Sequence, residues 1–314
     1  MKVLITGGAG FIGSHLCERL LKEDYEVVCL DSFDSYYNPN LKRNNVKPFL
    51  NSKNFRLVEG NILNRKLVRE LVKQDIDYVF HYAAQAGVRA SVENPAKTHK
   101  VNVEGTLNIL QACVDSQVRR IINASSSSVY GKMQDLSLGE KHPTIPISPY
   151  GVSKLSTEHY CRVFHEIYGL NIISLRLFTV YGTRMRPDLA ISIFMHKALN
   201  NEVIEIFGDG SKTRDFTYID DVVNANMLVM ENGFDMVYNI GSGARISIEM
   251  LARRIIKIIG SKSEIVYTFP MLGDVDDTKA DIRKAEAELG YEPQVDLNQG
   301  LQQYIEQEKS LCCQ

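Results

Sequence analysis

The chain of 314 residues has no excess of charge of one sign and no hydrophobic run long enough to cross a membrane. Its formal net charge is −2, and no block of like charge suggests a surface for nucleic acid or anionic lipid. The first residues, MKVLITG, open directly into a predicted strand and lack the three-part layout of a secretory signal. We therefore expect a cytoplasmic protein with neither a nucleic-acid partner nor a membrane partner.

The six cysteines follow no pattern that would serve a metal ion or a lipid anchor. None has metal-ligand spacing, and the four before residue 162 stand in apolar surroundings, where a thiol behaves as a small hydrophobe. The adjacent Cys312 and Cys313 do not form a prenylation box, which needs a cysteine fourth from the end. We expect no metal site and a reducing compartment.

Short apolar runs alternate with helical stretches over the first 178 residues. We predict strands at 3–6, 26–31, 55–60, 78–84, 120–126 and 172–178, helices at 11–23, 64–74, 95–116 and 149–168, and a polar loop at 32–48. Strands that are apolar on both faces and alternate with helices indicate a parallel sheet covered by helices. The fold class is therefore α/β, a Rossmann-type doubly wound sheet, with a smaller C-terminal α/β lobe.

A glycine triplet marks a dinucleotide site at the first strand-to-helix turn. Gly7, Gly10 and Gly13 leave no Cβ to block the turn or hold a pyrophosphate away from the start of the helix. Asp31 ends the second strand, 18 residues past Gly13, where a carboxylate accepts both ribose hydroxyls and repels a 2′-phosphate. The predicted cofactor is therefore NAD. We also expect Asn61 and Ile62 near adenine, while the small Ala83 and Ala84 leave room for the cofactor.

Tyr150 and Lys154 are four residues apart at the start of a predicted helix, and so lie on one face. A lysine ammonium near a tyrosine hydroxyl favours the phenolate and lowers the tyrosine pKa, as would the positive nicotinamide ring. Such a tyrosine can act as a general base near neutral pH. In isolation, the same spacing also fits an ordinary surface pair.

Several segments together resemble the extended short-chain dehydrogenase/reductases that act on nucleotide sugars: TGGAGFIG, HYAAQAG, SSSSVYG, LRLFTVYG and GDGSKTRDFTYIDDV, besides the tyrosine–lysine pair. The resemblance is closest to the UDP-glucuronate 4-epimerases. It implies that Phe11 and Ile12 help to bind NAD, and that Lys154 binds the nicotinamide ribose. It also implies that Tyr150 acts on the sugar 4-hydroxyl and that Ser126 is the third catalytic hydroxyl.

The two residues after Ser126 discriminate between reactions within this family. The similar 4,6-dehydratases carry Asp-Glu there, and the similar UDP-glucuronate decarboxylases carry a glutamate at the second position. This chain has Ser127 and Ser128, which cannot do the work of a carboxylate. The resemblance therefore implies epimerisation, in which a transient 4-keto sugar is reduced again from its opposite face.

The preferred sugar is glucuronate, because LRLFTVYGTRMRPD is similar to the glucuronate enzymes, while the glucose enzymes usually have asparagine in place of Thr179. Thr179, Ser127 and Ser128 can donate hydrogen bonds to a sugar carboxylate, and Arg186 can pair with it. Arg89, within HYAAQAGVR, also fits that subfamily. UDP-glucose or its N-acetyl analogue remains the alternative substrate. Arg186 could also be a solvated loop charge that contacts no substrate.

The nucleotide contacts are implied by resemblance alone. They place Phe207 beside the base, Arg214 on the diphosphate and Asp274 on the ribose. We assign residues 1–178, with contributions from 220–245, to NAD binding and 179–314 mainly to the nucleotide sugar.

A homodimer is expected, because related enzymes pair the two helices predicted at 95–116 and 149–168. Those helices carry Val103, Leu107, Leu110, Leu155 and Phe164. Two rivals stay open: a non-catalytic NAD-binding regulator, and a reductase that releases NADH.

Overall fold

A parallel sheet of seven strands forms the centre of the molecule, in the order β11-β6-β5-β4-β1-β2-β3. The computed structural model describes residues 1–132, 135, 137–269 and 275–312. The strands are β1 (Lys2–Thr6), β2 (Glu26–Asp31), β3 (Phe55–Glu59), β4 (Tyr78–His81), β5 (Arg120–Ser126), β6 (Ile172–Leu177) and β11 (Val237–Ile240). The chain runs outward from β1 in both directions, so the predicted doubly wound Rossmann-type sheet is confirmed.

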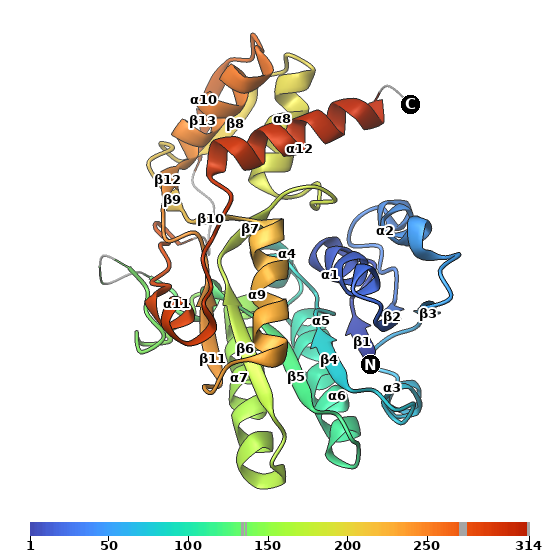
Figure 1. The fold of residues 1–314 in the computed structure, drawn as a ribbon. Coiled ribbons are helices and arrows are strands. Elements are labelled where there is room, and N and C mark those ends of the chain that lie inside the picture. The colour runs from blue at the N-terminus through green and yellow to red at the C-terminus, as the bar shows by residue number, and fades with distance from the viewer. Residues whose placement is uncertain (133–134, 136, 270–274, 313–314) are drawn as a thin grey trace.

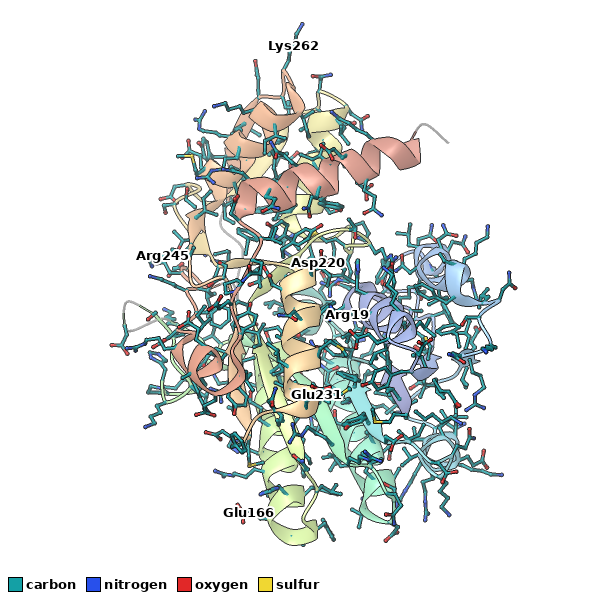
Figure 2. All side chains as sticks on the ribbon, viewed as in Figure 1. Arg19, Glu166, Asp220, Glu231, Arg245 and Lys262 are labelled. Carbon is teal, nitrogen blue, oxygen red and sulfur yellow. The ribbon has the colours of Figure 1, made fainter. Side chains whose placement is uncertain are left out.

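Helices cover both faces of this sheet (Figure 1). Helices α1 (Phe11–Lys22) and α9 (Ile219–Glu231) pack against each other on one face. Helices α3 (Arg65–Val72), α6 (Gly105–Val114) and α7 (Pro149–Tyr168) cover the other face. Figure 2 shows Asp220 and Glu231 at the two ends of α9, with Arg19 of α1 beside that helix.

Each face of the sheet has its own apolar core, because successive side chains of a strand point to opposite sides. Val3 and Ile5 of β1 belong to the core that includes Leu16 of α1. Leu4, between them, belongs to the core that includes Val68 of α3. This division explains why the strands are apolar on both faces.

Most of the elements after β6 gather at the end of the sheet where the parallel strands finish (Figure 1). They are β7 (Thr179–Tyr181), α8 (Ala190–Leu199), β8 (Ile204–Phe207), β9 (Thr213–Arg214), β10 (Phe216–Tyr218), β12 (Ile246–Ser247), α10 (Ile248–Ile259), β13 (Ile265–Thr268) and α12 (Leu297–Cys312). Helix α11 (Arg283–Leu289) packs instead against β11 and α9. Strands β8 and β13 pair in parallel, and α10 packs against α8 and α12. Among the helices of the described residues, none is long and apolar enough to cross a membrane.

The predicted loop at 32–48 is wrong in part, because it contains helix α2 (Pro39–Val46) and a 3₁₀ turn, η1 (Lys47–Phe49). The Asn38 side chain caps α2 by accepting the backbone N–H of Asn40, and Pro39 stands in the first turn. The segment is polar, so it shows little helical periodicity, and only this capping signal could have revealed the helix.

The predicted helix at 95–116 is present over residues 95–114, but it is not α-helical throughout. It consists of α5 (Pro95–His99), a π-helical turn, η2 (Lys100–Glu104), and α6, and it is preceded by a short helix, α4 (Val88–Glu93). Within the π-helical turn, Asn102 accepts the backbone N–H of Gln85 (2.7 Å) and donates to the Ser153 hydroxyl (2.9 Å). The turn therefore ties this helix to the loop after β4 and to α7, which a periodicity argument does not detect.

Candidate active site

A cavity of about 630 Å³ lies where the carboxyl ends of the strands meet the C-terminal elements, the usual ligand position in an open α/β sheet. Every expected site residue within the described ranges lines it. These are Gly7, Gly10, Phe11, Ile12, Gly13, Asp31, Asn61, Ile62, Ala83, Ala84, Arg89, Ser126, Ser127, Ser128, Tyr150, Lys154, Thr179, Arg186, Phe207 and Arg214. Asp274 lies outside the described residues.

The turn after β1 is a cradle that side chains would fill. Gly7 has a φ of 70°, and a Cβ there would lie 2.7 Å from the Ala83 nitrogen. A Cβ at Gly13 would lie 2.2 Å from the Gly7 carbonyl oxygen. Gly10 precedes the first turn of α1, whose free N–H groups point out of the helix start. This close backbone approach in front of a helix N-terminus fits a dinucleotide pyrophosphate.

Asp31 is buried at the end of β2 and is held from two sides. Its Oδ1 accepts the backbone N–H of Phe33 (2.8 Å), and its Oδ2 accepts that of Ala9 (3.2 Å). Lys42 of α2 places its Nζ 3.9 Å from Oδ1. Burial raises the pKa of Asp31, while the charge of Lys42 and the two backbone hydrogen bonds oppose that rise. Sequence analysis missed Lys42, because it falls in the segment expected to be a loop.

The expected adenine residues lie at the end of β3. Ile62 is buried against Gly105, where a Cβ would meet the Ile62 side chain at 2.4 Å, and its carbonyl accepts the amide of Asn108 (3.0 Å). Asn61 turns its side-chain oxygen to the backbone N–H of Leu63 (2.9 Å). Both residues therefore shape the wall of the cavity through a well-anchored turn.

Tyr150 and Lys154 both point from the start of α7 into the site. Ser148 caps this helix by accepting the N–H of Gly151 (3.1 Å), and the Ser91 hydroxyl accepts the N–H of Tyr150 (3.1 Å). The Lys154 Nζ donates to the carbonyl of Ala124 on β5 (2.6 Å) and lies 5.9 Å from the centre of the Tyr150 ring. The lysine is therefore fixed between the sheet and the tyrosine.

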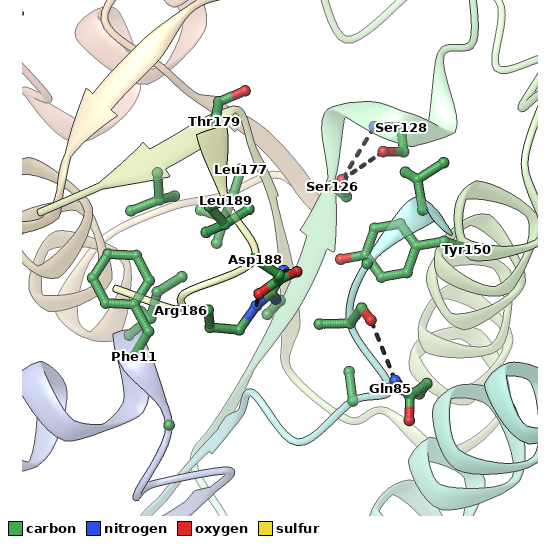
Figure 3. A pocket seen from close by; sticks show the side chains of 18 of the residues that line it. Phe11, Gln85, Ser126, Ser128, Tyr150, Leu177, Thr179, Arg186, Asp188 and Leu189 are labelled. Atoms are coloured by element: carbon green, nitrogen blue, oxygen red, sulfur yellow. Dashed lines mark hydrogen bonds and ion pairs between the residues drawn. The ribbon is translucent and has the colours of Figure 1, made fainter. Parts of the chain in front are cut away.

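The Ser126 hydroxyl acts to lower the pKa of Tyr150, and Figure 3 shows the Tyr150 hydroxyl directed into the cavity. Ser126 also donates to the Ser128 hydroxyl (3.2 Å) and accepts the Ser128 N–H (3.1 Å). Ser127 and Ser128 begin the 3₁₀ turn η3 (Ser127–Val129), which follows β5 directly. This arrangement gives a proton on Tyr150 a hydroxyl partner at the end of the central sheet.

The expectation that Lys154 lowers the tyrosine pKa is not what the protein alone shows. Burial raises the pKa of Tyr150, and the groups that oppose this rise are the Arg186 charge and the Ser126 hydroxyl. Burial also lowers the pKa of Lys154, to about 8, although Cys161 and Glu158 act in the opposite direction. Desolvation has the largest effect on the pKa of both groups, and the charge of Arg186 favours the phenolate of Tyr150.

A buried polar network lies next to the catalytic residues, between α7 and the sheet. Sequence analysis did not predict it. Glu158, one turn after Lys154, accepts the Ser125 hydroxyl (2.5 Å) and pairs with Arg176 through two hydrogen bonds (2.9 and 2.7 Å). Arg176 also donates to the Tyr130 hydroxyl (3.0 Å). The network joins β5, β6 and α7, the three elements that carry or flank the reactive groups.

Arg186 is not a solvated loop charge. Its side chain is 18% exposed, and its guanidinium donates to Asp188 from Nε (2.9 Å) and Nη2 (3.0 Å). The preceding residues fix this segment to α1, because the Thr183 carbonyl bonds the His15 ring (2.9 Å) and Arg184 pairs with Glu18. Arg186 therefore enters the cavity from an anchored segment between β7 and α8.

The residues expected near the nucleotide line the same cavity from α4, β8 and β9. The Arg89 guanidinium lies 4.7 Å from the centre of the Phe207 ring. Arg214 donates to the backbone carbonyls of Thr213 (2.8 Å) and Val275 (2.7 Å). Arg89 is thus a neighbour of the expected base position.

Within the described residues, no group of His, Cys, Asp and Glu side chains could hold a metal ion.

Comparisons with known proteins agree with this geometry. A family model described as "NAD dependent epimerase/dehydratase family" matches residues 3–241. A solved UDP-glucuronic acid 4-epimerase from Bacillus cereus, in complex with UDP-glucuronic acid and NAD, is 39% identical with a TM-score of 0.94, over 99% of this chain and 100% of that one. A solved UDP-glucose 4-epimerase from Thermotoga maritima, with UDP-glucose, is 36% identical with a TM-score of 0.93, over 99% and 100%. The UDP-glucuronate 4-epimerase of Thermodesulfobacterium geofontis is 36% identical over 305 residues, which is 96% of this chain and 94% of that protein.

The chain belongs to the NAD dependent epimerase/dehydratase family, as the resemblance predicted. Within that family it is an epimerase, and NAD is its cofactor. The glycine cradle before α1 fits that cofactor on steric grounds.

Proposed function

We propose that the chain interconverts UDP-glucuronate and UDP-galacturonate by epimerisation at C4. The observation that carries this choice is Arg186, a cation that enters the cavity beside Tyr150 and acts on its pKa. Thr179, Ser127 and Ser128 line the same cavity and can donate hydrogen bonds to a carboxylate. A neutral hydroxymethyl group would need no such cation.

In this proposal Tyr150 takes the proton of the sugar 4-hydroxyl and later returns it. Ser126, whose hydroxyl acts on the pKa of Tyr150, would hydrogen-bond O4 and help to pass the proton. Lys154 fixes the cofactor ribose from its position on the Ala124 carbonyl. NAD, which the glycine turn before α1 and Asp31 would hold, would supply reversible hydride transfer at C4.

The side chains around the 4-keto sugar determine which product forms. Ser127 and Ser128 occupy the positions at which similar dehydratases and decarboxylases carry carboxylates. These hydroxyls supply neither the acid and base that eliminate water nor a glutamate. Return of the hydride to the opposite face of the turned sugar is then the remaining course, and it consumes no second substrate.

The nucleotide is assigned to the C-terminal elements, with Phe207 beside the base, Arg214 near the diphosphate and Asp274 on the ribose. The position of Arg89 over Phe207 adds a cation close to the base. This division gives residues 179–314 most of the sugar-nucleotide contacts, and residues 1–178 with part of 220–245 those to NAD.

The test is to incubate the protein with UDP-glucuronate, UDP-glucose and UDP-N-acetylglucosamine and to separate the products. Conversion of UDP-glucuronate alone, or in strong preference, supports the proposal. Preference for a neutral sugar would instead favour UDP-glucose, the substrate named for the Thermotoga maritima structure. Net formation of NADH at 340 nm would indicate a reductase, and NAD binding without turnover a regulator.

We also propose a cytoplasmic homodimer. Three of the five apolar residues first suggested for its interface, Val103, Leu110 and Phe164, are buried in the protomer's own core, whereas Leu107 and Leu155 are only partly buried. Other α7 side chains are exposed instead, including Tyr160 and Ile167, the latter 66% exposed. A mass near 35.5 kDa by light scattering at micromolar concentration would contradict the dimer. The buried free thiols suit a reducing compartment.

A further inference from the structure

Asp188 occupies the edge of Arg186 that a substrate carboxylate would use. Its Oδ1 accepts Nε of Arg186 (2.9 Å) and its Oδ2 accepts Nη2 (3.0 Å), a two-pronged contact. Both residues line the cavity, and Figure 3 shows the pair facing the Tyr150 ring. The site therefore already contains one carboxylate on the guanidinium of Arg186.

A second element of the chain holds Asp188 in place. The Tyr36 hydroxyl donates to Asp188 Oδ2 (2.9 Å), and the Arg186 guanidinium lies 5.7 Å from the centre of the Tyr36 ring. Gly87 leaves room for this hydroxyl, because a Cβ there would lie 2.4 Å from it. Burial alone would raise the pKa of Asp188, but Arg186 and Tyr36 together lower it, which keeps Asp188 ionised.

We propose that Asp188 is an internal counter-ion of Arg186 that competes with the carboxylate of an acidic UDP-sugar and lets the site also accept neutral ones. The inference rests on the proposed function only in placing the sugar C6 substituent beside Arg186. Asp188 acts through Arg186 and is therefore a positioning residue that sets specificity.

The reasoning follows from the charge that each sugar meets. With Asp188 present, a neutral sugar covers a neutral ion pair, whereas an acidic sugar brings a second negative charge to one guanidinium. Without Asp188, an acidic sugar would restore a neutral pair. A neutral sugar would then exclude water from an unpaired cation, which is costly. Removal of the Asp188 charge should thus change the two affinities in opposite directions.

The experiment compares Asp188→Asn with the unaltered protein, both loaded with NAD, for the Kd of UDP-glucuronate and of UDP-glucose. We expect tighter UDP-glucuronate binding, weaker UDP-glucose binding, and a ratio of the two Kd values that changes by about tenfold, as for one charge pair at partial exposure. Tyr36→Phe keeps the ring under Arg186 and removes only the hydroxyl, so the same change should appear with smaller size.

The matched control is Glu18→Gln on α1. It removes the carboxylate that pairs with Arg184, which lies in the same segment as Arg186, and it alters no charge beside Arg186. Its ratio of Kd values should equal that of the unaltered protein. If Asp188→Asn does not fold, Tyr36→Phe still decides the matter.

Weaker binding of UDP-glucuronate in Asp188→Asn would overturn the inference, because it would mean that Asp188 chiefly orients Arg186. An unchanged ratio in both variants would overturn it as well. Turnover of the unaltered protein is a separate readout. A protein that binds UDP-glucuronate but epimerises only UDP-glucose would refute the proposed function, while the variant ratio would still test Asp188.

Discussion

Arg186→Ala tests whether one cation selects the substrate. The change removes a guanidinium that is 18% exposed and that sits beside both Tyr150 and Asp188. A charge-assisted hydrogen-bonded pair is worth about 1.5–3 kcal/mol, or roughly 10- to 150-fold in affinity. The loss for UDP-glucuronate should reach the upper part of that range, because Asp188 is left in the cavity as an unpaired negative charge that repels the substrate carboxylate.

Two further readouts follow from the same geometry. Because the charge of Arg186 opposes the raised pKa of Tyr150, its removal should raise that pKa further. Since the base acts in its deprotonated form, the rising limb of the kcat/KM–pH profile should move to higher pH for every sugar. Loss of restraint on a β-keto acid should also allow some decarboxylation, giving a UDP-4-keto-pentose and NADH left on the enzyme.

The assay is steady-state epimerisation of UDP-glucuronate and UDP-glucose by both proteins, with product separation. We expect a selective loss for the acidic sugar. The double variant Arg186→Ala/Asp188→Asn provides the control, because it removes the stranded negative charge and should recover part of the UDP-glucuronate affinity. Equal losses for the two sugars would refute the reasoning, since they would assign Arg186 a general role in shaping the segment.

Three other predictions concern catalysis, the cofactor and the buried network. Tyr150→Phe should lower turnover by roughly 10²–10⁴-fold with little change in UDP-sugar binding, and near-normal turnover would assign the proton transfer elsewhere. The purified protein should release NAD or NADH on denaturation without any having been added, and full dependence on added NADP would contradict the role of Asp31. Glu158→Gln should lower the free energy of unfolding by about 3–5 kcal/mol, because it leaves Arg176 as a buried cation without its carboxylate partner. Urea unfolding measures that loss, and a change below about 1 kcal/mol would mean that the pair contributes little.

The parts of the site that the sequence predicted depend on short segments. The glycine turn, Asp31 and the Tyr150–Lys154 pair each lie at one strand end or within one helical turn. The spacing of residues along the chain therefore predicts the local position of each feature. The alternation of strands and helices predicted the sheet for the same reason.

The parts that it missed depend on contacts between distant segments. Tyr36 and Asp188 are 152 residues apart, and Lys42 reaches Asp31 from within the short polar helix α2. Of the five apolar residues expected at the dimer face, Leu110 and Phe164 are buried in the core on one face of the sheet. Periodicity indicates that a helix has an apolar side but does not say which neighbour covers it.

Arg186 links the acid–base group of the site to the ion pair proposed to set specificity. It lies next to the group proposed to move the proton, Tyr150, and to the carboxylate that shares its charge, Asp188. A change at Arg186 should therefore alter both the pH profile and the choice of sugar. The Tyr36 hydroxyl donates to Asp188, and the Tyr36 ring lies near the Arg186 guanidinium. Removal of that hydroxyl leaves the guanidinium charge in place. Tyr36→Phe should accordingly alter the choice of sugar with little movement of the pH profile, which separates specificity from acid–base chemistry within a single ion pair.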